Sequence, residues 1–514
     1  MNVLILMGDQ HRYDALGCAT EGIAPHERTW LMEAGVRTPH LDRLAATGAR
    51  FHQAVANLPV CVPCRHSFIT GLYPYQTGIL TNAHYWPDQP PVPTLAHYLR
   101  NAGYATAAVG KMHWKHREAP DHHVPDKRGF DYRVGRGQNT DGPVDLVVRA
   151  KDEERARRVQ AEYAGRFGTG GESREGYVGD VSELPAAELP EALLTDEAVG
   201  YLRRHHESRR EQPFCLLVSL VRPHPPNVVP PEYAHLYPPD AVPLPPAAPE
   251  GFHEDDPHVR RSIQNRGWGE MDEGELRLSI SRYLGNVTYL DDCLGRVLTE
   301  IDALGYAENT LVVLLSDHGE MLGERRVAGR GGAHTKYSLY DAAERVPLIV
   351  RWPGVSQSGV VSHAAVELVD LMPTWLEAAG LEVPAYLPGR SLRPLLEGAG
   401  PPECGWREAT LAEQYTGATE DGGAGGPRGQ WAYRERRWKL IERAGARSAF
   451  YDLEKDPYEL ENLIDSAGHV GERERMRGRL IREVIGRAER YPARYTGAVT
   501  VATAERAARV PPGA

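Results

Sequence analysis

Residues 2–10 read NVLILMGDQ, a short apolar run that ends in a glycine and two polar residues. No basic residue precedes the run, and it is too short to cross a membrane. It therefore predicts a buried β-strand and not a signal peptide. A strand that is apolar along its whole length is typical of a parallel sheet covered on both faces. The stretch indicates an α/β fold whose first strand ends in Asp9 and Gln10.

Similar apolar runs recur along the chain, and helical patterns separate them. The clearest helix is predicted over residues 286–304, where apolar side chains follow the helical period and Gly305 supplies a stop. This alternation favours a large mixed, mostly parallel sheet that is sandwiched by helices. The further predicted strands are residues 105–109, 214–220, 311–315 and 347–350.

The last quarter of the chain has a different pattern. Residues 437–441 and 448–453 predict paired antiparallel strands, and residues 472–488 predict a helix. We therefore expect a catalytic α/β domain over residues 1–387 and a smaller C-terminal α+β subdomain over residues 388–514, with a short antiparallel sheet. The composition of residues 133–179 is typical of an insertion. The glycine-rich residues 422–426 are typical of a flexible stretch.

Composition excludes several classes of partner. The formal net charge of -11 over 514 residues argues against nucleic acid or an anionic membrane surface. No apolar run reaches the length of a membrane span, so we expect a cytoplasmic protein with no membrane partner. Six cysteines are too few for a disulfide framework. The sequence leaves open whether the chain forms a homo-oligomer.

Polar side chains follow four of the predicted strands at the point where each strand ends. In open α/β sheets, ligands bind beyond the carboxyl ends of the strands, so these residues predict one shared site. They are Asp9 and Gln10 after the first strand, Lys111 and His113 after the second, His224 after the third, and Asp317 and His318 after the fourth.

The segment LPVCVPCRHSFITG, residues 58–71, holds two cysteines three residues apart. A redox dithiol would need a thioredoxin-like neighbourhood, and zinc would need two more soft ligands. The sequence supplies neither. Pro63 suits the first turn of a helix, which places Cys61 at a helix N-terminus that favours an anion. Arg65 adds a fork of donors, so the segment is suited to meet a tetrahedral oxyanion.

The pattern Cys61-x-Pro63-x-Arg65 resembles the motif by which sulfatases have a cysteine converted to formylglycine. Other segments resemble sulfatase segments in the family's order: NVLILMGDQ, GKMH, RPHPP, SDHGEMLGE, KYSLYDAAERVPLIVRWPG, VELVDLMPTWLEAAG and FYDLEKDPYELENL. The chain is thus identified as a member of the formylglycine-dependent type I sulfatases, in the alkaline-phosphatase-like superfamily. Cys64 departs from the motif, in which serine is most common at that position.

This resemblance implies a sulfuric ester hydrolase that acts on a small-molecule sulfate ester, such as an aryl sulfate. A formylglycine-generating enzyme would oxidise Cys61 to the aldehyde, 3-oxoalanine, which hydrates to a gem-diol. One hydroxyl attacks sulfur and displaces the alcohol. The second hydroxyl then loses its proton and expels sulfate, a step that an unmodified serine could not perform.

The resemblance also implies roles for the site residues. One divalent cation would be bound, with Ca²⁺ expected and Mn²⁺ or Mg²⁺ as alternatives. Its ligands would be Asp9, Gln10, modified Cys61, Asp317 and His318. Lys111 and Lys336 would neutralise the sulfate oxygens, Arg65 would hold the diol, His224 would protonate the leaving alcohol, and His113 would take a proton during sulfate release. Asn82 and His334 are further candidates for substrate contacts.

Two other functions remain open. Relatives with the same architecture hydrolyse phosphonate monoesters or phosphodiesters with the same formylglycine and metal site. Lys111 and His113 favour sulfate, because the phosphonate enzymes tend to carry neutral side chains there. An inactive relative that only binds sulfated ligands is disfavoured, because every expected charged position is filled.

Overall fold

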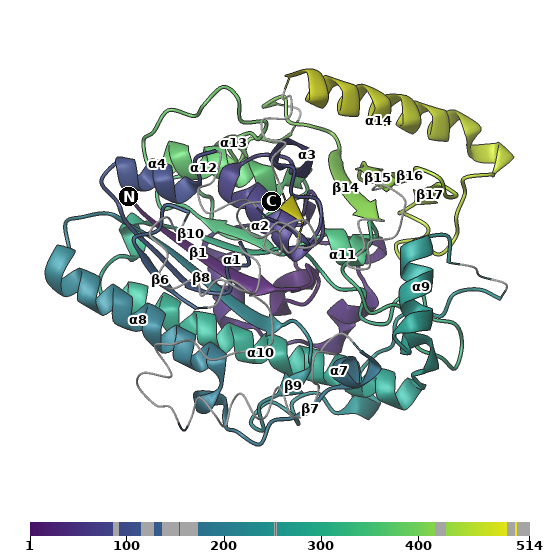
Figure 1. The fold of residues 1–514 in the computed structure, drawn as a ribbon, viewed down its shortest axis with the longest axis horizontal. Coiled ribbons are helices and arrows are strands. Elements are labelled where there is room, and N and C mark those ends of the chain that lie inside the picture. The colour runs from purple at the N-terminus through teal and green to yellow at the C-terminus, as the bar shows by residue number, and fades with distance from the viewer. Residues whose placement is uncertain are drawn as a thin grey trace, which may run out of the picture.

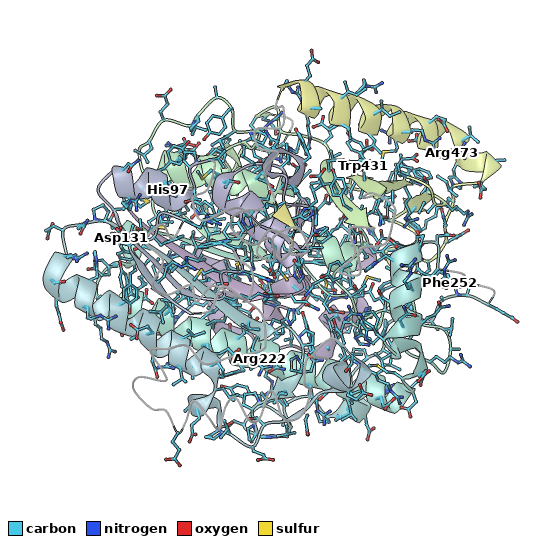
Figure 2. All side chains as sticks on the ribbon, viewed as in Figure 1. His97, Asp131, Arg222, Phe252, Trp431 and Arg473 are labelled. Atoms are coloured by element: carbon cyan, nitrogen blue, oxygen red, sulfur yellow. The ribbon has the colours of Figure 1, made fainter. Side chains whose placement is uncertain are left out.

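A computed structural model of the chain describes residues 1–85, 92–114, 128–135, 154, 173–250, 252, 254–401, 403–416, 428–490 and 499–500. A central sheet crosses the larger part of the molecule, and a smaller unit with one long helix lies at its edge (Figure 1). Side chains fill the space between these layers (Figure 2). In the described part of the chain, no helix is long and apolar enough to cross a membrane.

The central sheet has eight strands in the order β12-β2-β11-β10-β1-β8-β5-β6. All pairs are parallel except those that β11 makes with β10 and β2, so the sheet is mixed and mostly parallel as predicted. Its strands are β1 (Asn2–Asp9), β2 (Ala49–Phe51), β5 (Ala105–Gly110), β6 (Tyr132–Val134), β8 (Phe214–Pro223), β10 (Thr310–Ser316), β11 (Leu348–Arg351) and β12 (Val360–Ser362).

Both faces of this sheet are buried, because successive side chains of a strand point to opposite faces. On β1, Ile5 belongs to a cluster with apolar residues of α2 (Cys61–Thr70), α4 (Leu95–Asn101) and α12 (Leu371–Ala378). Its neighbour Leu6 belongs to a second cluster with α1 (Pro39–Thr47), α8 (Pro190–Arg209) and α10 (Glu273–Ala303). This two-sided burial explains the continuous apolar runs in the sequence.

The remaining elements are short pieces that connect or flank these layers. The helices are α3 (Pro74–Thr77), α7 (Arg174–Val178), α9 (Pro257–Asn265), α11 (Asp341–Glu344) and α13 (Arg393–Leu396). The paired strands are β3 (Ala54–Val55) with β13 (Val366–Glu367), β4 (His84–Tyr85) with β18 (Val499–Thr500), and β7 (Asp180–Val181) with β9 (Val228–Val229).

The smaller unit is an antiparallel sheet of β14 (Thr410–Thr416), β15 (Arg428–Arg434), β16 (Trp438–Arg443) and β17 (Ala449–Asp452). On β16, Leu440 faces α14 (Val470–Arg490), and the adjacent Ile441 faces residues near α11 of the larger unit. The outer position of α14 is visible in Figure 1. One face of this sheet is therefore an interface with the part of the chain that carries Asp317 and Lys336.

The predicted strands are confirmed, and so are the antiparallel pair and the C-terminal helix. The helix predicted over residues 286–304 is longer and begins at Glu273. Most of the predicted insertion over residues 133–179, and all of residues 422–426, lie outside the described residues. The division of the chain at residue 387 stays a prediction.

Candidate active site

The carboxyl ends of the central strands meet at one edge, as the sequence predicts. Asp9 is the last residue of β1, Lys111 follows β5, His224 follows β8, and Asp317 follows β10. All four side chains are at most 2% exposed. The topology therefore gathers charged groups from distant parts of the sequence into one buried cluster.

Cys61 reaches the same cluster from the first residue of α2. Val60 before it is extended, and the left-handed Gly71 ends the helix. Asn82 caps the helix start, because its Oδ1 accepts a hydrogen bond from the Val62 backbone N–H at 3.0 Å. The predicted helix N-terminus at Cys61 is thus confirmed. Cys61 and Cys64 are both free thiols in this structure.

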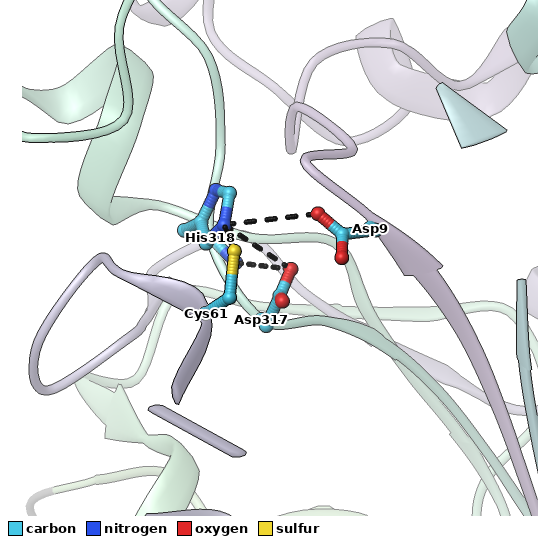
Figure 3. Close-up of side chains that lie close together, drawn as sticks. All are labelled: Asp9, Cys61, Asp317 and His318. Carbon is cyan, nitrogen blue, oxygen red and sulfur yellow. Dashed lines mark hydrogen bonds and ion pairs between the residues drawn. The ribbon is translucent and has the colours of Figure 1, made fainter. Parts of the chain in front are cut away.

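Four potential ligand atoms converge at the centre of the site. One atom from each of Asp9, Cys61, Asp317 and His318 lies within 4.8 Å of the others (Figure 3). The Cys61 Sγ lies 3.1 Å from His318 Nε2. On the other side of its ring, His318 Nδ1 lies 3.0 Å from the carbonyl oxygen of Gly319. That contact favours a proton on Nδ1, so Nε2 can present a lone pair to the cluster.

Arg65 forms ion pairs with both carboxylates of the cluster. Its guanidinium donates to Asp9 Oδ2 at 2.9 Å and to Asp317 Oδ2 at 2.8 Å. The remaining donors reach the Lys111 carbonyl at 2.7 Å and Ser219 Oγ at 2.9 Å. Within the described residues, Arg65 makes no hydrogen bond to Cys61. Its geometry fixes both acids in one orientation, and the predicted contact with a diol at position 61 stays a prediction.

Positive charge surrounds the Cys61 sulfur. Lys111 Nζ lies 3.7 Å from Sγ and forms a close ion pair with Asp9 Oδ2. Burial raises the pKa of the Cys61 thiol, but nearby charged groups, led by Lys111 and Lys336, outweigh burial and hold that pKa well below its ordinary value. The site therefore stabilises an anion at position 61.

Two histidines face the sulfur from other sides. The Nε2 atom of His224 lies 2.8 Å from Lys336 Nζ, while its Nδ1 lies 2.6 Å from the Pro225 carbonyl oxygen. Burial and the nearby Lys336 lower the pKa of His224. Burial likewise lowers the pKa of His113 to about 4, and a hydrogen bond to Cys61 opposes that shift. Both rings are thus held neutral before an anionic ligand arrives.

The other predicted residues make contacts of their own. The side chain of Gln10 lies beside Lys336, with Oε1 3.5 Å from Lys336 Nζ, and its role as a metal ligand stays a prediction. Besides capping α2, Asn82 donates through Nδ2 to the Tyr337 hydroxyl at 3.0 Å. His334 is fully buried, with its ring centroid 4.7 Å from that of Tyr177. A substrate contact for Asn82 or His334 stays a prediction.

The sequence did not single out three residues that shape the site. Ser219 orients Arg65, and Tyr177 and Glu320 bind the side-chain amide of Gln10. Glu320 stands in the segment SDHGEMLGE, so it could have been noted by its position after Asp317 and His318. Tyr177 comes from α7 and carried no comparable signal.

The donor set suits a hard divalent cation. The four converging residues offer two carboxylates, an imidazole nitrogen and the sulfur of Cys61, all buried. The buried Asp9 Oδ1 has no hydrogen-bond partner among the described residues, although a cation would satisfy it. Oxygen-rich sets of this kind bind Ca²⁺ or Mg²⁺, and the imidazole also admits Mn²⁺. The residues present therefore fit the metal site that the sequence predicts.

Comparison with solved structures shows that the sheet has the architecture of the alkaline-phosphatase-like class of hydrolases. The family model for Sulfatase matches residues 1–381, and a model for the C-terminal region of N-sulphoglucosamine sulphohydrolase matches residues 329–485. The chain belongs to the sulfatase family. Enzymes of this family generally use a metal ion and a formylglycine.

Individual relatives agree with this assignment. The chain is 29% identical to a choline-sulfatase of Rhizobium meliloti over 84% of this chain and 78% of that protein. It is 27% identical to an arylsulfatase of Clostridium perfringens over 95% of each chain. Among solved structures, a phosphonate monoester hydrolase from Silicibacter pomeroyi matches with a TM-score of 0.74 and 26% identity, over 97% of this chain and 99% of that one.

Proposed function

We propose that this chain hydrolyses a small-molecule sulfate ester with a formylglycine derived from Cys61 and one divalent metal. The observation that carries the proposal is the convergence of Asp9, Cys61, Asp317 and His318 within 4.8 Å. In this proposal the nucleophile position, the metal ligands and the positive side chains of Lys111 and Lys336 belong to one buried cluster.

The metal would be held by Asp9, Gln10, Asp317, His318 and the modified side chain at position 61. A bound divalent cation stabilises negative charge on nearby oxygens and lowers the pKa of a hydroxyl beside it. The aldehyde hydrate would supply that hydroxyl as the nucleophile that attacks sulfur. Arg65 orients Asp9 and Asp317 for this task.

The chain's own side chains would manage charge around the reacting sulfate. Lys111 lies beside Cys61, and Lys336 lies beside His224, so both ammonium groups can neutralise charge that develops on the sulfate oxygens. An anionic ester adds negative charge next to His224, which favours its protonated form. His224 could then give its proton to the leaving alcohol, while His113 could receive one at position 61 during sulfate release.

One observation favours a second candidate, the hydrolysis of phosphonate monoesters or phosphodiesters. The phosphonate monoester hydrolase from Silicibacter pomeroyi matches nearly the full length of this chain. Lys111 and His113 both contact Cys61, and they support sulfate as the preferred group because the phosphonate enzymes tend to carry neutral side chains at these positions.

A parallel measurement of kcat/KM separates the two reactions. The substrates are an aryl sulfate, an aryl phosphonate monoester and a phosphodiester with the same phenol as leaving group, and Cys61→Ala is the control. We expect the sulfate to react fastest and the control to lose all three activities. A faster phosphonate reaction would support the second candidate, and unchanged rates in Cys61→Ala would contradict both.

A further inference from the structure

Gln10 is held at every polar group of its backbone. Its N–H donates to Asp317 Oδ1 at 3.2 Å, and its carbonyl accepts from the Tyr283 hydroxyl at 2.9 Å. The residue adopts a φ of 65°, which lies in the left-handed region. A non-glycine residue keeps this conformation only when its surroundings impose it. These backbone contacts therefore fix the direction in which the Gln10 side chain leaves the backbone.

The side chain of Gln10 is fixed in the same way. Its Nε2 donates to the Tyr177 hydroxyl at 3.2 Å and makes a short hydrogen bond to Glu320 Oε2. The Lys336 ammonium lies 3.5 Å from Oε1 and only donates hydrogen bonds, so the amide oxygen faces Lys336. The amide nitrogen therefore faces Glu320. A flipped amide would place Nε2 against the Lys336 ammonium.

Glu320 itself has little freedom. It is 1% exposed, its Oε1 accepts from the Leu322 N–H at 2.9 Å, and its Oε2 accepts from the Tyr177 hydroxyl at 3.2 Å. Its backbone N–H donates to the Ala342 carbonyl of α11 at 2.9 Å. A carboxylate fixed from several sides can orient the amide that it contacts.

We propose that Glu320 is a positioning residue that holds the Gln10 amide with its oxygen toward the cation. The inference rests on the proposed metal site. The hydrogen bonds from Nε2 to Glu320 and Tyr177 fix the orientation of the amide, so Oε1 is presented before a cation binds. Gln10 would thus provide a ligand oxygen that adds no charge.

A double-mutant cycle on metal affinity tests this role. Titration calorimetry with Ca²⁺ would be run on the full chain and on Glu320→Ala, Gln10→Ala and the double variant. Residues behind a metal ligand typically change affinity by about 10- to 100-fold, so we expect a loss of that size in Glu320→Ala. If Glu320 acts through Gln10, the same substitution has little further effect in the Gln10→Ala background.

Two further variants separate an effect on metal affinity from an effect on folding. Glu320→Gln keeps the shape but lets residue 320 donate as well as accept, so we expect a measurable loss of affinity with an unchanged thermal midpoint in chelator. Tyr177→Phe removes only the second acceptor of the Gln10 amide and should cost less than Glu320→Ala.

The outcomes separate this inference from the proposed function. Wild-type affinity in both Glu320 variants, or an undiminished loss in the Gln10→Ala background, would overturn the positioning role. Failure of the unaltered chain to bind Ca²⁺, Mn²⁺ or Mg²⁺ would instead contradict the proposed metal site.

Discussion

Replacing Lys439 with methionine should disrupt the contact between the C-terminal sheet and the active-site segment. The Lys439 ammonium is fully buried and contacts Asp341 at 2.8 Å, Glu459 at 2.9 Å and Glu344 at 3.0 Å. Burial alone would lower the pKa of Lys439, but the three carboxylates raise it above its ordinary value. Removing one partner of a buried ion pair typically costs about 3–5 kcal/mol, because the remaining charge is left uncompensated. We expect a loss of that order in Lys439→Met.

The assay is urea unfolding of the full chain, followed in parallel with Lys455→Met. Lys455 is exposed and lies 3.9 Å from Asp452, so its loss should cost less than about 1 kcal/mol. The deficit of Lys439→Met should also shrink at acidic pH, because Glu344 and Glu459, whose pKa values burial raises, then bind protons and no longer repel Asp341. If Lys439→Met and Lys455→Met have equal midpoints at neutral pH, the reasoning about this buried cluster is wrong.

Three further outcomes are expected. Burial raises the pKa of Glu413 from 4.5 to about 7, so the folded state loses stability as pH rises between these values. In urea unfolding, the free energy of unfolding of Glu413→Gln should match that of wild type near pH 4 and exceed it by roughly 3 kcal/mol near pH 8. A difference that stays constant with pH would contradict this. Removal of bound cations with a chelator should lower the thermal midpoint of unfolding. Ca²⁺ at about 100 times its Kd should then raise the free energy of unfolding by about 2.7 kcal/mol. No response to Ca²⁺, Mn²⁺ or Mg²⁺ would refute the cation site. His224→Ala should lower kcat by about 10²- to 10⁴-fold for an alkyl sulfate and by less for a sulfate of an acidic phenol, whereas equal losses would argue against a general acid.

The sequence predicted the sheet and the edge where the site lies, because both follow from local patterns. Apolar runs define the buried strands, and the polar residues after each run must meet where parallel strands end. Asp9, Lys111, His224 and Asp317 come together for this reason. The helix start at Cys61 was likewise predictable, because Pro63 favours the first helical turn.

Contacts between side chains from distant segments could not be predicted in this way. Arg65 binds Asp9 and Asp317, and Asn82 caps α2, and the sequence indicated neither contact. The long start of α10 was missed for a related reason. Gly285 lowers helix propensity locally, yet an added Cβ there would lie 2.7 Å from Val229 Cγ2 of β9. That glycine is required by packing, which a single sequence does not reveal.

Mass spectrometry of the peptide that spans residue 61, from chain co-produced with a formylglycine-generating enzyme, tests the central claim most directly. We predict that an aldehyde replaces the thiol of Cys61 and that sulfatase activity rises in proportion to the converted fraction. Two results would contradict the account. One is a full hydrolysis rate in protein that carries only the unmodified thiol. The other is converted protein that shows no activity toward any sulfate ester in the presence of Ca²⁺, Mn²⁺ or Mg²⁺.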